Sequence, residues 1–326
     1  MATISVRYLG FDLRSPVILS SSSLTNSVAG IQRAAQAGAG AVVVKSLFEE
    51  QIDADAGTAD EDVDYSAHPE AEQYVRQMSK HLGPEDYLRL IEEAKRVVDI
   101  PVIASVNCVT PRWWGDYGRQ IATTGADALE LNIAIMPRGD ASPADIEASY
   151  CRIVERVRTQ VDLPLAVKIG PYFTSLPRFV AQLRSSGADA VVLFNRFYQL
   201  DIDVETQSLA PGYQFSAPQE IHVPLRWISI LAGETACDLV GSTAVHTGAD
   251  VVKMLLAGAT AVQVCTAVYR HGYDRIAAMN ADLGAWMDRS GFTAVEQFRG
   301  RVSRIGSTNP DGYERLQYIK ALTGIA

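Results

Sequence analysis

Cysteine and histidine are scarce in this sequence, and neither residue type recurs at the spacing of a metal site. Four cysteines and five histidines are scattered over 326 residues without a CxxC or HExxH motif. A disulfide framework, an iron–sulfur cluster and a metal centre held by this chain are therefore not expected. With 48% hydrophobic residues, the chain carries enough apolar material to bury a core without such a staple.

Positive charge and long apolar runs are also lacking. The 29 basic and 38 acidic residues give a net charge of −9, which disfavours nucleic acid and anionic membrane as partners because both require a basic surface. No window approaches about 18 consecutive apolar residues, so no transmembrane helix is expected. The opening residues do not have a basic stretch followed by an apolar one, so no signal peptide is expected and the cytoplasm is the expected location.

What the sequence does contain is a repeated junction between helix and strand. Four segments read Gly-Ala-x-Ala followed by a short apolar run: residues 38–45, 125–132, 187–195 and 258–266. Glycine is favoured just past the end of a helix, where φ becomes positive, and a short β-branched run is typical of a strand buried on both faces. A second type of junction places proline, which ends the preceding helix, before the apolar run. It occurs at residues 15–18, 100–103 and 163–166.

The two junction types define eight strands separated by amphipathic helices. The expected strands are residues 16–21, 41–45, 101–107, 128–132, 164–168, 190–195, 238–242 and 261–265. One helical segment places Ile146, Tyr150 and Ile153 on one face behind a Ser142-Pro143 cap, and similar apolar faces occur in other gaps. Alternating strands and helices predict a parallel sheet, and eight units favour an α/β fold of the (β/α)8 TIM barrel type over a doubly wound sheet. We therefore expect residues 1–326 to form a single barrel domain.

Two stretches interrupt this rhythm. Residues 49–83, which begin with an acidic segment rich in Gly, Ala and Asp, follow the second strand, and residues 196–236 separate strands six and seven. In a barrel both insertions are expected at the C-terminal face, where they usually build lids and substrate walls. The acidic segment is equally well explained as a solvated loop.

Every expected strand ends in hydrogen-bonding residues, and in this fold such residues face the active site. In chain order they are Ser21-Ser22, Lys45-Ser46, Asn107, Asn132, Lys168, Asn195, Ser242-Thr243 and Cys265-Thr266. Burying an ammonium or an amide without a partner is costly, so packing alone does not explain two lysines and three asparagines, although a single Asn often only closes a turn. Glu130 alternates onto the same side of its strand as Asn132, and we expect its carboxylate to neutralise one of the two lysines inside the barrel.

This set of side chains suits a flat, anionic cofactor such as a flavin. A reduced flavin carries negative charge near N1 and O2, which a lysine stabilises, and its amide-like edge needs the donors and acceptors that asparagine supplies. Its phosphate needs backbone N–H groups after strands seven and eight, the usual phosphate site of a barrel. Residues 241–244 and 265–266 occupy that place.

In their order and spacing, these motifs resemble the dihydroorotate dehydrogenase family over most of the chain. The segments that carry the resemblance are residues 8–17 (lead-in hairpin and first strand), 44–46 (lysine–serine after strand two), 130–132 (end of strand four), 167–173 (lysine strand), 255–268 (last strand and phosphate loop) and 296–300 (closing helix). Asn195 stands where that family has an asparagine that contacts substrate. Single motifs of this kind are weak, whereas their order is specific.

The resemblance implies an FMN site and a set of catalytic residues. The cofactor-binding residues that it implies are Ser21, Ser22, Lys45, Ser46, Asn107, Asn132, Lys168, Thr243, Ala244, Cys265 and Thr266. Within this set the two serines at 21 and 22 are expected to touch the ring through their backbone, Lys168 to lie at the N1/O2 edge, and the last four residues to hold the phosphate. The candidate catalytic residues are Lys45, Asn132, Lys168, Asn195 and Cys108.

The chain departs from the family pattern where the reaction needs a base. The family carries a catalytic Cys or Ser after its Glu-Leu-Asn segment, whereas residues 132–138 read NIAIMPR here. Isoleucine and alanine cannot accept a proton. Cys108 and Tyr172, at other strand ends, are candidate replacements, although a buried cysteine is more often a small hydrophobic residue. Thr243-Ala244 also replaces the Gly-Gly of the family's phosphate turn, which limits positive φ.

These observations leave several functions open. The leading hypothesis is an FMN-dependent oxidoreductase of the dihydroorotate dehydrogenase type, which converts dihydroorotate to orotate in pyrimidine biosynthesis, with its usual base missing. A second is an FMN-binding protein with a changed substrate or no dehydrogenase activity. A third is a Schiff-base aldolase on the same barrel, with Lys45 or Lys168 as the nucleophile. A non-enzymatic scaffold has no need of so many polar strand ends.

The expected partners follow from the same residues. Residues 194–198 read FNRFY, which places a cation and aromatic rings at the mouth of the barrel. This composition suits a small planar anionic substrate, or a stacked lid. A homodimer is expected only by analogy with relatives.

Overall fold

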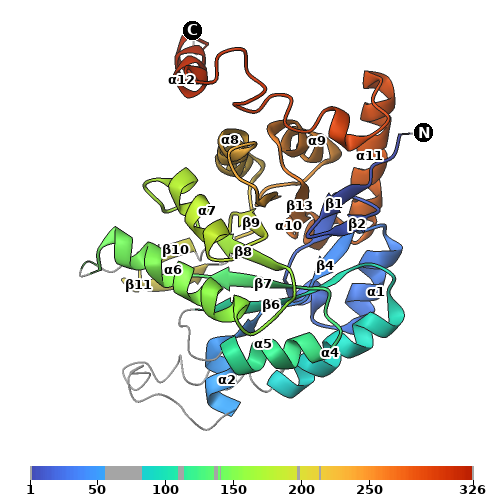
Figure 1. Ribbon diagram of the computed structural model, residues 1–326, viewed down its shortest axis with the longest axis vertical. Helices are drawn as coiled ribbons and strands as arrows, with labels where there is room; N and C mark the ends of the chain where they lie inside the picture. Colours follow the sequence, from blue (N-terminus) through green and yellow to red (C-terminus); the bar gives the residue numbers. More distant parts are fainter. Residues whose placement is uncertain are drawn as a thin grey trace.

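Eight parallel strands close into a barrel in the computed structural model (Figure 1). The structure describes residues 2–55, 83–108, 114–135, 139, 141–196, 199–212 and 214–324. The barrel strands are β3 (Val17–Leu19), β4 (Ala41–Val43), β6 (Val102–Cys108), β7 (Ala128–Ile133), β8 (Leu165–Ile169), β9 (Ala190–Leu193), β12 (Asp238–Ser242) and β13 (Ala261–Val264). Each pairs with the next in this order, and β13 pairs with β3 to close the sheet. The predicted (β/α)8 TIM barrel is confirmed.

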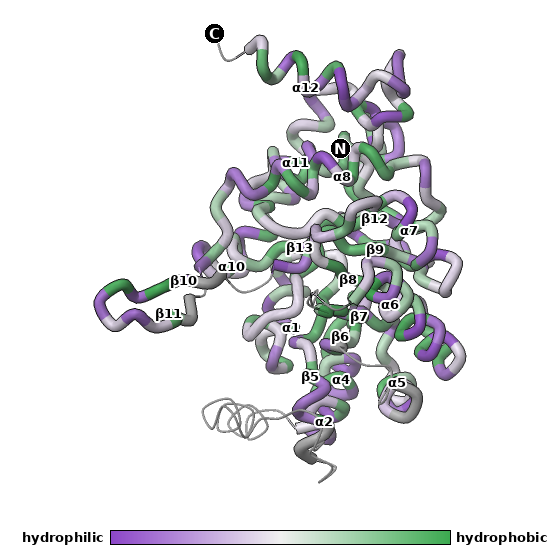
Figure 2. Tube along the Cα trace, turned by 90° about the vertical axis from the view of Figure 1, so that its left-hand side faces the viewer, coloured by the Kyte–Doolittle hydropathy of each residue, from purple (hydrophilic) through white to green (hydrophobic). Residues whose placement is uncertain are grey.

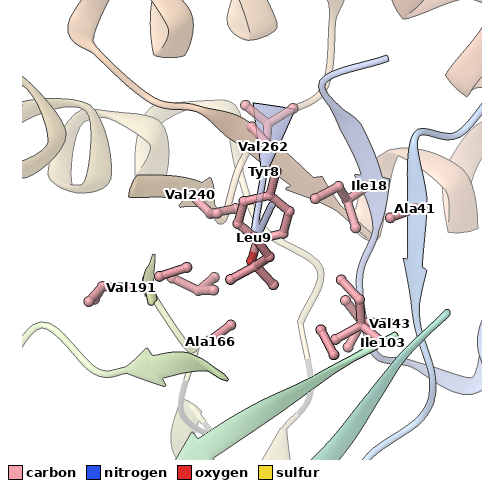
Figure 3. Close-up of a cluster of buried hydrophobic side chains, with 14 of the residues drawn as sticks. Tyr8, Leu9, Ile18, Ala41, Val43, Ile103, Ala166, Val191, Val240 and Val262 are labelled. Atoms are coloured by element: carbon pink, nitrogen blue, oxygen red, sulfur yellow. The ribbon is translucent and has the colours of Figure 1, made fainter. Parts of the chain in front are cut away.

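The N-terminal hairpin closes the amino-terminal end of the barrel. Its strands β1 (Val6–Tyr8) and β2 (Phe11–Leu13) pair antiparallel. Tyr8 and Leu9 lie among side chains from the first residues of the barrel strands (Figure 3), and the Leu9 N–H donates to Asp238 at the start of β12. The interior is therefore filled from this end, which leaves the carboxyl ends of the strands as the open end of the barrel.

Amphipathic helices surround the strands (Figure 1). They are α1 (Val28–Gln36), α4 (Pro84–Val97), α5 (Trp114–Thr123), α6 (Pro143–Arg158), α7 (Leu176–Ser185), α8 (His222–Leu231), α9 (Gly248–Ala257) and α11 (Asp274–Ser290), with the short α10 (Thr266–His271) after β13. Ser142 caps α6 and Pro143 is its first residue, as the sequence predicts. Gly38 and Gly258 follow α1 and α9 with φ of 88° and 115°, which explains why these junctions carry glycine.

The two insertions depart from the simple barrel at its carboxyl end. The first begins with β5 (Leu47–Phe48), which pairs with β6, and α2 (Glu49–Asp55); residues 56–82 lie outside the described residues. The second forms an antiparallel hairpin of β10 (Gln199–Asp203) and β11 (Ser208–Gly212), followed by the 3-10 helix η3 (Pro218–Ile221) and then α8. Within residues 196–236, only the part before α8 is an insertion into the barrel, because α8 is the helix that normally connects two successive barrel strands, here β9 and β12.

The C-terminal segment differs from expectation. The prediction of a closing helix at residues 296–300 is wrong, because this segment contains only the single 3-10 turn η4 (Val295–Gln297), with Phe298 as its C-cap. A separate helix, α12 (Tyr313–Thr323), follows and projects from the barrel (Figure 1). No described helix combines the length and the apolar character needed to cross a membrane.

Candidate cofactor site at the carboxyl ends of the strands

The parallel register brings three of the predicted polar residues side by side. Asn107 on β6 lies opposite Asn132 on β7, and Asn132 lies opposite Lys168 on β8. Residues in register on neighbouring strands point to the same face of the sheet. The three side chains therefore form one row near the carboxyl ends of β6, β7 and β8.

Lys168 is the most buried member of this row, with 6% of the residue exposed. Its Nζ donates to Gln263 Oε1 at 2.9 Å and to Ser20 Oγ at 3.2 Å, and a Glu130 carboxylate oxygen lies 3.9 Å away. The Gln263 amide also donates to Glu130. The prediction that Glu130 faces one of the two lysines is confirmed for Lys168.

Ser20 and Gln263, which hold Lys168, are functional candidates that sequence reasoning missed. Both are buried, at 4% and 2% exposed, and the Ser20 hydroxyl also donates to Gln263 Oε1 at 3.1 Å. The signal for Gln263 was its place two residues before Cys265, because alternate residues of a strand share a face. A polar residue at such a position of a buried strand needs partners, and here they are Lys168 and Glu130.

Asn195 reaches the same row from β9. Its Nδ2 donates to Asn132 Oδ1 at 2.8 Å, and its backbone N–H donates to Ile169 O at 2.7 Å, which extends the strand pairing past β9. An amide group has two donors and two acceptor lone pairs, so this bond leaves each side chain with further hydrogen-bonding capacity. The pair can therefore bind a ligand while each member fixes the orientation of the other.

A chain of hydroxyl groups links the first strands. The Ser21 hydroxyl lies 2.9 Å from that of Ser46 and accepts from the Ser46 N–H at 2.8 Å, and Ser46 Oγ lies 2.8 Å from Ser105 Oγ. The Ser22 hydroxyl instead caps the 3-10 helix η1 (Ser23–Thr25) by accepting from the Leu24 N–H. The Ser22 side chain thus caps a local turn and also reaches the Cys265 thiol, while the contact expected of Ser22 with the ring is through its backbone.

Lys45 and Cys265 lie near Lys168. Burial lowers the pKa of the Lys45 ammonium, and the neighbouring Cys265 acts in the opposite direction. Burial raises the pKa of the Cys265 thiol, while a hydrogen bond with Ser22 and the positive charges of Lys168 and Lys45 partly offset that rise. Both ammonium groups therefore act on one region of the barrel mouth, where they favour a negatively charged ligand.

The turn after β12 adopts positive φ without glycine. Thr243 has a φ of 77° and Ala244 a φ of 59°, and the Thr243 hydroxyl donates to Phe194 O at 3.1 Å. The left-handed region costs a residue with a Cβ about 1–2 kcal/mol. The replacement of Gly-Gly by Thr-Ala thus leaves the turn geometry in place at an energetic cost, and such turns present N–H groups that can bind an anion.

A cavity of about 110 Å3 that opens to solvent lies over these strand ends. The predicted residues that line it are Ser21, Lys168, Asn195, Thr243, Ala244, Cys265 and Thr266. Asn132 and Ser46 contact this lining through their bonds to Asn195 and Ser21. Asn107 is half-buried in register with Asn132. The structure thus gathers residues from several strands around one cavity, which a flat molecule with polar edges can occupy.

The wall of the cavity near Thr266 contains residues that the sequence did not indicate. Ser216, in the loop after β11, donates to Thr266 Oγ1 at 3.1 Å and lies 3.2 Å from His246 Nε2. Burial, followed by the positive charge of Arg270, lowers the pKa of His246. Ser216 and Thr266 are 50 residues apart, so no local pattern could have joined them.

Arg196, expected to offer a cation at the mouth, is held within the protein. Its guanidinium lies 2.8 Å from the Glu220 carboxylate and also donates to the Gln214 carbonyl. Its charge is therefore largely compensated before any substrate binds. Residues 197 and 198 of the predicted aromatic mouth lie outside the described residues.

Of the two candidate replacement bases, only Tyr172 has a described side chain, and it lies outside this cavity. Cys108 ends β6, and its side chain lies outside the described residues. Tyr172 is 65% exposed and lines a separate cavity with Ile135, Tyr150 and Phe173. The Ile135 N–H donates to the Tyr150 hydroxyl at 3.3 Å, and burial raises the pKa of Tyr150 to about 12. Ile135, after β7, thus lies beside the aromatic side chains of Tyr150 and Phe173, and the Glu147 carboxylate belongs to the same cavity lining.

The family model and the similar proteins that match this chain share one description, dihydroorotate dehydrogenase. A family model described as dihydroorotate dehydrogenase matches residues 67–287. Similar proteins, each called the catalytic subunit of dihydroorotate dehydrogenase B (NAD(+)), occur in Methanosarcina mazei, Methanosarcina acetivorans and Pyrococcus abyssi. The chain is 28%, 26% and 25% identical to them, over 89%, 89% and 93% of its own length and 92%, 93% and 100% of theirs. The resemblance therefore extends over most of each chain.

Proposed function

Because the chain belongs to the dihydroorotate dehydrogenase family, we propose that it binds FMN at the carboxyl ends of its barrel strands and is an FMN-dependent oxidoreductase acting on a CH–CH group. The observation that carries this proposal is Lys168, whose buried ammonium is held by Ser20, Gln263 and Glu130 at the base of the cavity. A buried ammonium at a ligand cavity is expensive to maintain and is suited to stabilising negative charge on the ligand.

The donor set of the cavity fits the parts of FMN. Lys168 would bind the N1/O2 edge, and Asn132 and Asn195, which already orient each other, would bind the polar edge of the ring. The turn at Thr243 and Ala244 would bind the phosphate through its N–H groups. When bound, FMN supplies a two-electron acceptor for a hydride, and the protein's part is to position it, exclude water and stabilise the charge that develops.

Proton removal from the substrate is the step for which the chain lacks the usual residue. After Asn132 the family resemblance leads us to expect a Cys or Ser, whereas this chain has Ala134 and Ile135 there. General base catalysis typically contributes about 10²–10⁴-fold to a rate. We therefore propose that the substrate differs from dihydroorotate, or that dihydroorotate is oxidised slowly. A small planar anion remains the proposed class of substrate, because both lysines favour a negative ligand.

A Schiff-base aldolase is the second candidate, and one observation favours it. Burial lowers the pKa of Lys45, which increases the neutral, nucleophilic fraction of its amine. Lys168 is less suitable, because its amine nitrogen already donates to Ser20 and Gln263 and lies 3.9 Å from the Glu130 carboxylate. Borohydride trapping with a keto substrate would modify Lys45 if this function is correct, and would leave a flavoprotein unmodified.

Flavin titration tests the leading proposal directly. The purified protein should be yellow, and flavin-free protein should regain the flavin spectrum when FMN is added. Lys168→Ala should weaken FMN binding by about 10–100-fold, the value of a hydrogen bond to a charged group, whereas Lys253→Ala on the outer helix α9 should leave it unchanged. Protein that takes up no FMN under any condition would refute the proposal.

A turnover assay then separates cofactor binding from the substrate. FMN-loaded protein should oxidise dihydroorotate about 10²–10⁴-fold more slowly than a relative that carries the base. Ile135→Cys should raise that rate, while Ala122→Cys on the outer surface of α5 serves as the matched control. Ordinary turnover by the unmodified protein would show that another residue acts as the base.

A further inference from the structure

A second cavity lies at the opposite end of the barrel from the candidate cofactor site. It has a volume of about 400 Å3 and opens to solvent, a size within the range of about 300–1,000 Å3 that is typical of small-molecule sites. Its wall contains Asp238 and Leu239, where β12 begins, and Thr260, which directly precedes β13. None of its lining residues also lines the cofactor cavity, so the two cavities are separate.

Two helix ends and the C-terminal segment complete the wall of this second cavity. Helices α8 and α9 have Ala232 and Gly258 as their C-caps, and both residues line the cavity. Backbone hydrogen bonds tie residues 300–304 to the last turns of both helices. From there the chain continues to α12, which lies above α8 in Figure 2. The cavity is therefore enclosed by segments that are hydrogen-bonded to one another.

A hydrogen-bonded chain of three side chains forms the polar centre of this wall. Arg299 Nη1 donates to Thr260 Oγ1 at 3.0 Å, and the Thr260 hydroxyl donates to Asp238 Oδ1 at 3.1 Å. Thr260 is 2% exposed, so its hydroxyl is held in place. The guanidinium and the carboxylate are therefore close together, on either side of one oxygen atom.

Both charged groups keep hydrogen-bonding capacity for a ligand. A guanidinium has five N–H donors, and Arg299 uses one of them on Thr260 and forms no ion pair with a carboxylate of the described residues. Arg304, in the same segment, is by contrast paired with Glu234. The Asp238 carboxylate accepts two hydrogen bonds, although it can accept about four.

The charges around the cavity favour a ligand that carries both signs. A guanidinium without an ion pair binds a carboxylate or a phosphate group. The Asp238 carboxylate and the negative ends of the α8 and α9 dipoles oppose a purely anionic ligand, and a phosphate monoester brings about two negative charges. A ligand with one carboxylate and one ammonium group satisfies both Arg299 and Asp238. Because the two side chains lie close together, such a ligand can carry its two charged groups on a single carbon atom.

The remainder of the wall favours an apolar side chain on the ligand. The apolar lining residues are Ala232, Ala236, Cys237, Leu239 and Ile305. The Cys237 thiol donates to Ala188 O, and burial raises its pKa. Cys237 therefore stays neutral and contributes a small apolar surface.

We propose that this cavity is a second ligand site, which binds a small α-amino acid with an apolar side chain. Arg299 binds the carboxylate of the amino acid, Asp238 binds its ammonium group, and the apolar residues contact its side chain. The site is independent of FMN. It can therefore be tested on flavin-free protein, and its failure would leave the cofactor proposal unaffected.

Isothermal titration calorimetry with L-leucine and two matched compounds tests the need for both charges. Isocaproate lacks the ammonium group of leucine, and isopentylamine lacks its carboxylate. Leucine should bind at a single site per chain, and each matched compound should bind at least about tenfold more weakly, because one charged contact is lost. Isocaproate that binds as tightly as leucine would overturn the proposal, as would the absence of binding by both L-leucine and L-phenylalanine at about 10 mM.

Substitutions of the two charged residues locate the site. Arg299→Met, at an exposed side chain, should weaken leucine binding at least about tenfold and leave isopentylamine binding unchanged. Arg301→Met, two residues away and outside the lining, is the matched control and should change neither. Asp238→Asn keeps an acceptor for the Leu9 N–H and should weaken the binding of leucine but not that of isocaproate. Leucine binding that is unaffected by Arg299→Met would overturn the proposal, even if Asp238→Asn fails to fold.

Discussion

The buried pair of Lys168 and Glu130 makes a quantitative prediction that does not depend on any ligand. Their side chains are 8% and 1% exposed, and the charged atoms lie 3.9 Å apart. With an effective dielectric constant of about 20, Coulomb's law gives an attraction of about 4 kcal/mol at this distance.

A double-mutant cycle measures the coupling between Lys168 and Glu130. Lys168→Met should lower the free energy of unfolding by about 3–4 kcal/mol, because one carboxylate oxygen of Glu130 has no hydrogen bond among the described residues and would lose the Lys168 ammonium beside it. Glu130→Gln should cost about 2–3 kcal/mol, since Lys168 keeps its bonds to Ser20 and Gln263. The double variant should cost only about 2 kcal/mol, because neither charge is then left alone. The coupling free energy should therefore be about 3–5 kcal/mol.

Urea denaturation of flavin-free protein at pH 7, followed by circular dichroism, measures these free energies. Arg96 and Glu92 on α4 form the control pair, because they lie at nearly the same distance, 3.8 Å, but are 74% and 47% exposed. Their cycle should give a coupling below about 0.5 kcal/mol. Additive effects of Lys168→Met and Glu130→Gln, within about 0.5 kcal/mol, would refute the argument that burial makes this pair a single unit.

Two further predictions concern the wall of the cavity. Ala244→Gly should raise the free energy of unfolding by about 0.5–1 kcal/mol, because it removes left-handed strain, whereas Ala122→Gly in α5 should lower it by about 1 kcal/mol; a loss at both sites would contradict the strain. The folded state lowers the pKa of His246, so the unfolded chain binds the proton first and stability is lost as pH falls through about 6.5. His246→Asn should therefore lose less stability than the unmodified protein between pH 7.5 and 5.5 in the same urea assay, and an equal loss would assign that pH dependence to other groups.

The fold could be predicted because its signals are local. Gly38 and Gly258 take the positive φ that ends a helix, and the short apolar runs after them are buried along their whole length. Neither feature depends on distant residues. The prediction of a closing helix at residues 296–300 had no such local signal and rested on resemblance alone. These residues make only one 3-10 turn.

The candidate site could be predicted only in part, because its contacts are long-range. Strand ends indicated Asn132, Lys168 and Asn195, and parallel register then placed them together. The sequence could not indicate that Gln263 bonds to Lys168, 95 residues away, or that Glu220 engages the cation of Arg196. Which polar groups satisfy each other is decided by the closed barrel, where every strand end meets several others.

The proposed FMN site and the position where the family resemblance expects a base belong to structurally different parts of this chain. The polar groups around the cavity come from strand ends, whose positions are fixed by the pairing of eight strands, so changing one requires a compensating change in its partners, as with Lys168 and Glu130. A base placed after β7 would lie beyond the last paired residue, Ile133, where a substitution disturbs no strand contact. A barrel mouth suited to an anionic ring is therefore compatible with a change of the residue at that position. This difference in constraint is why family membership supports the cofactor proposal more strongly than it supports the oxidation of dihydroorotate.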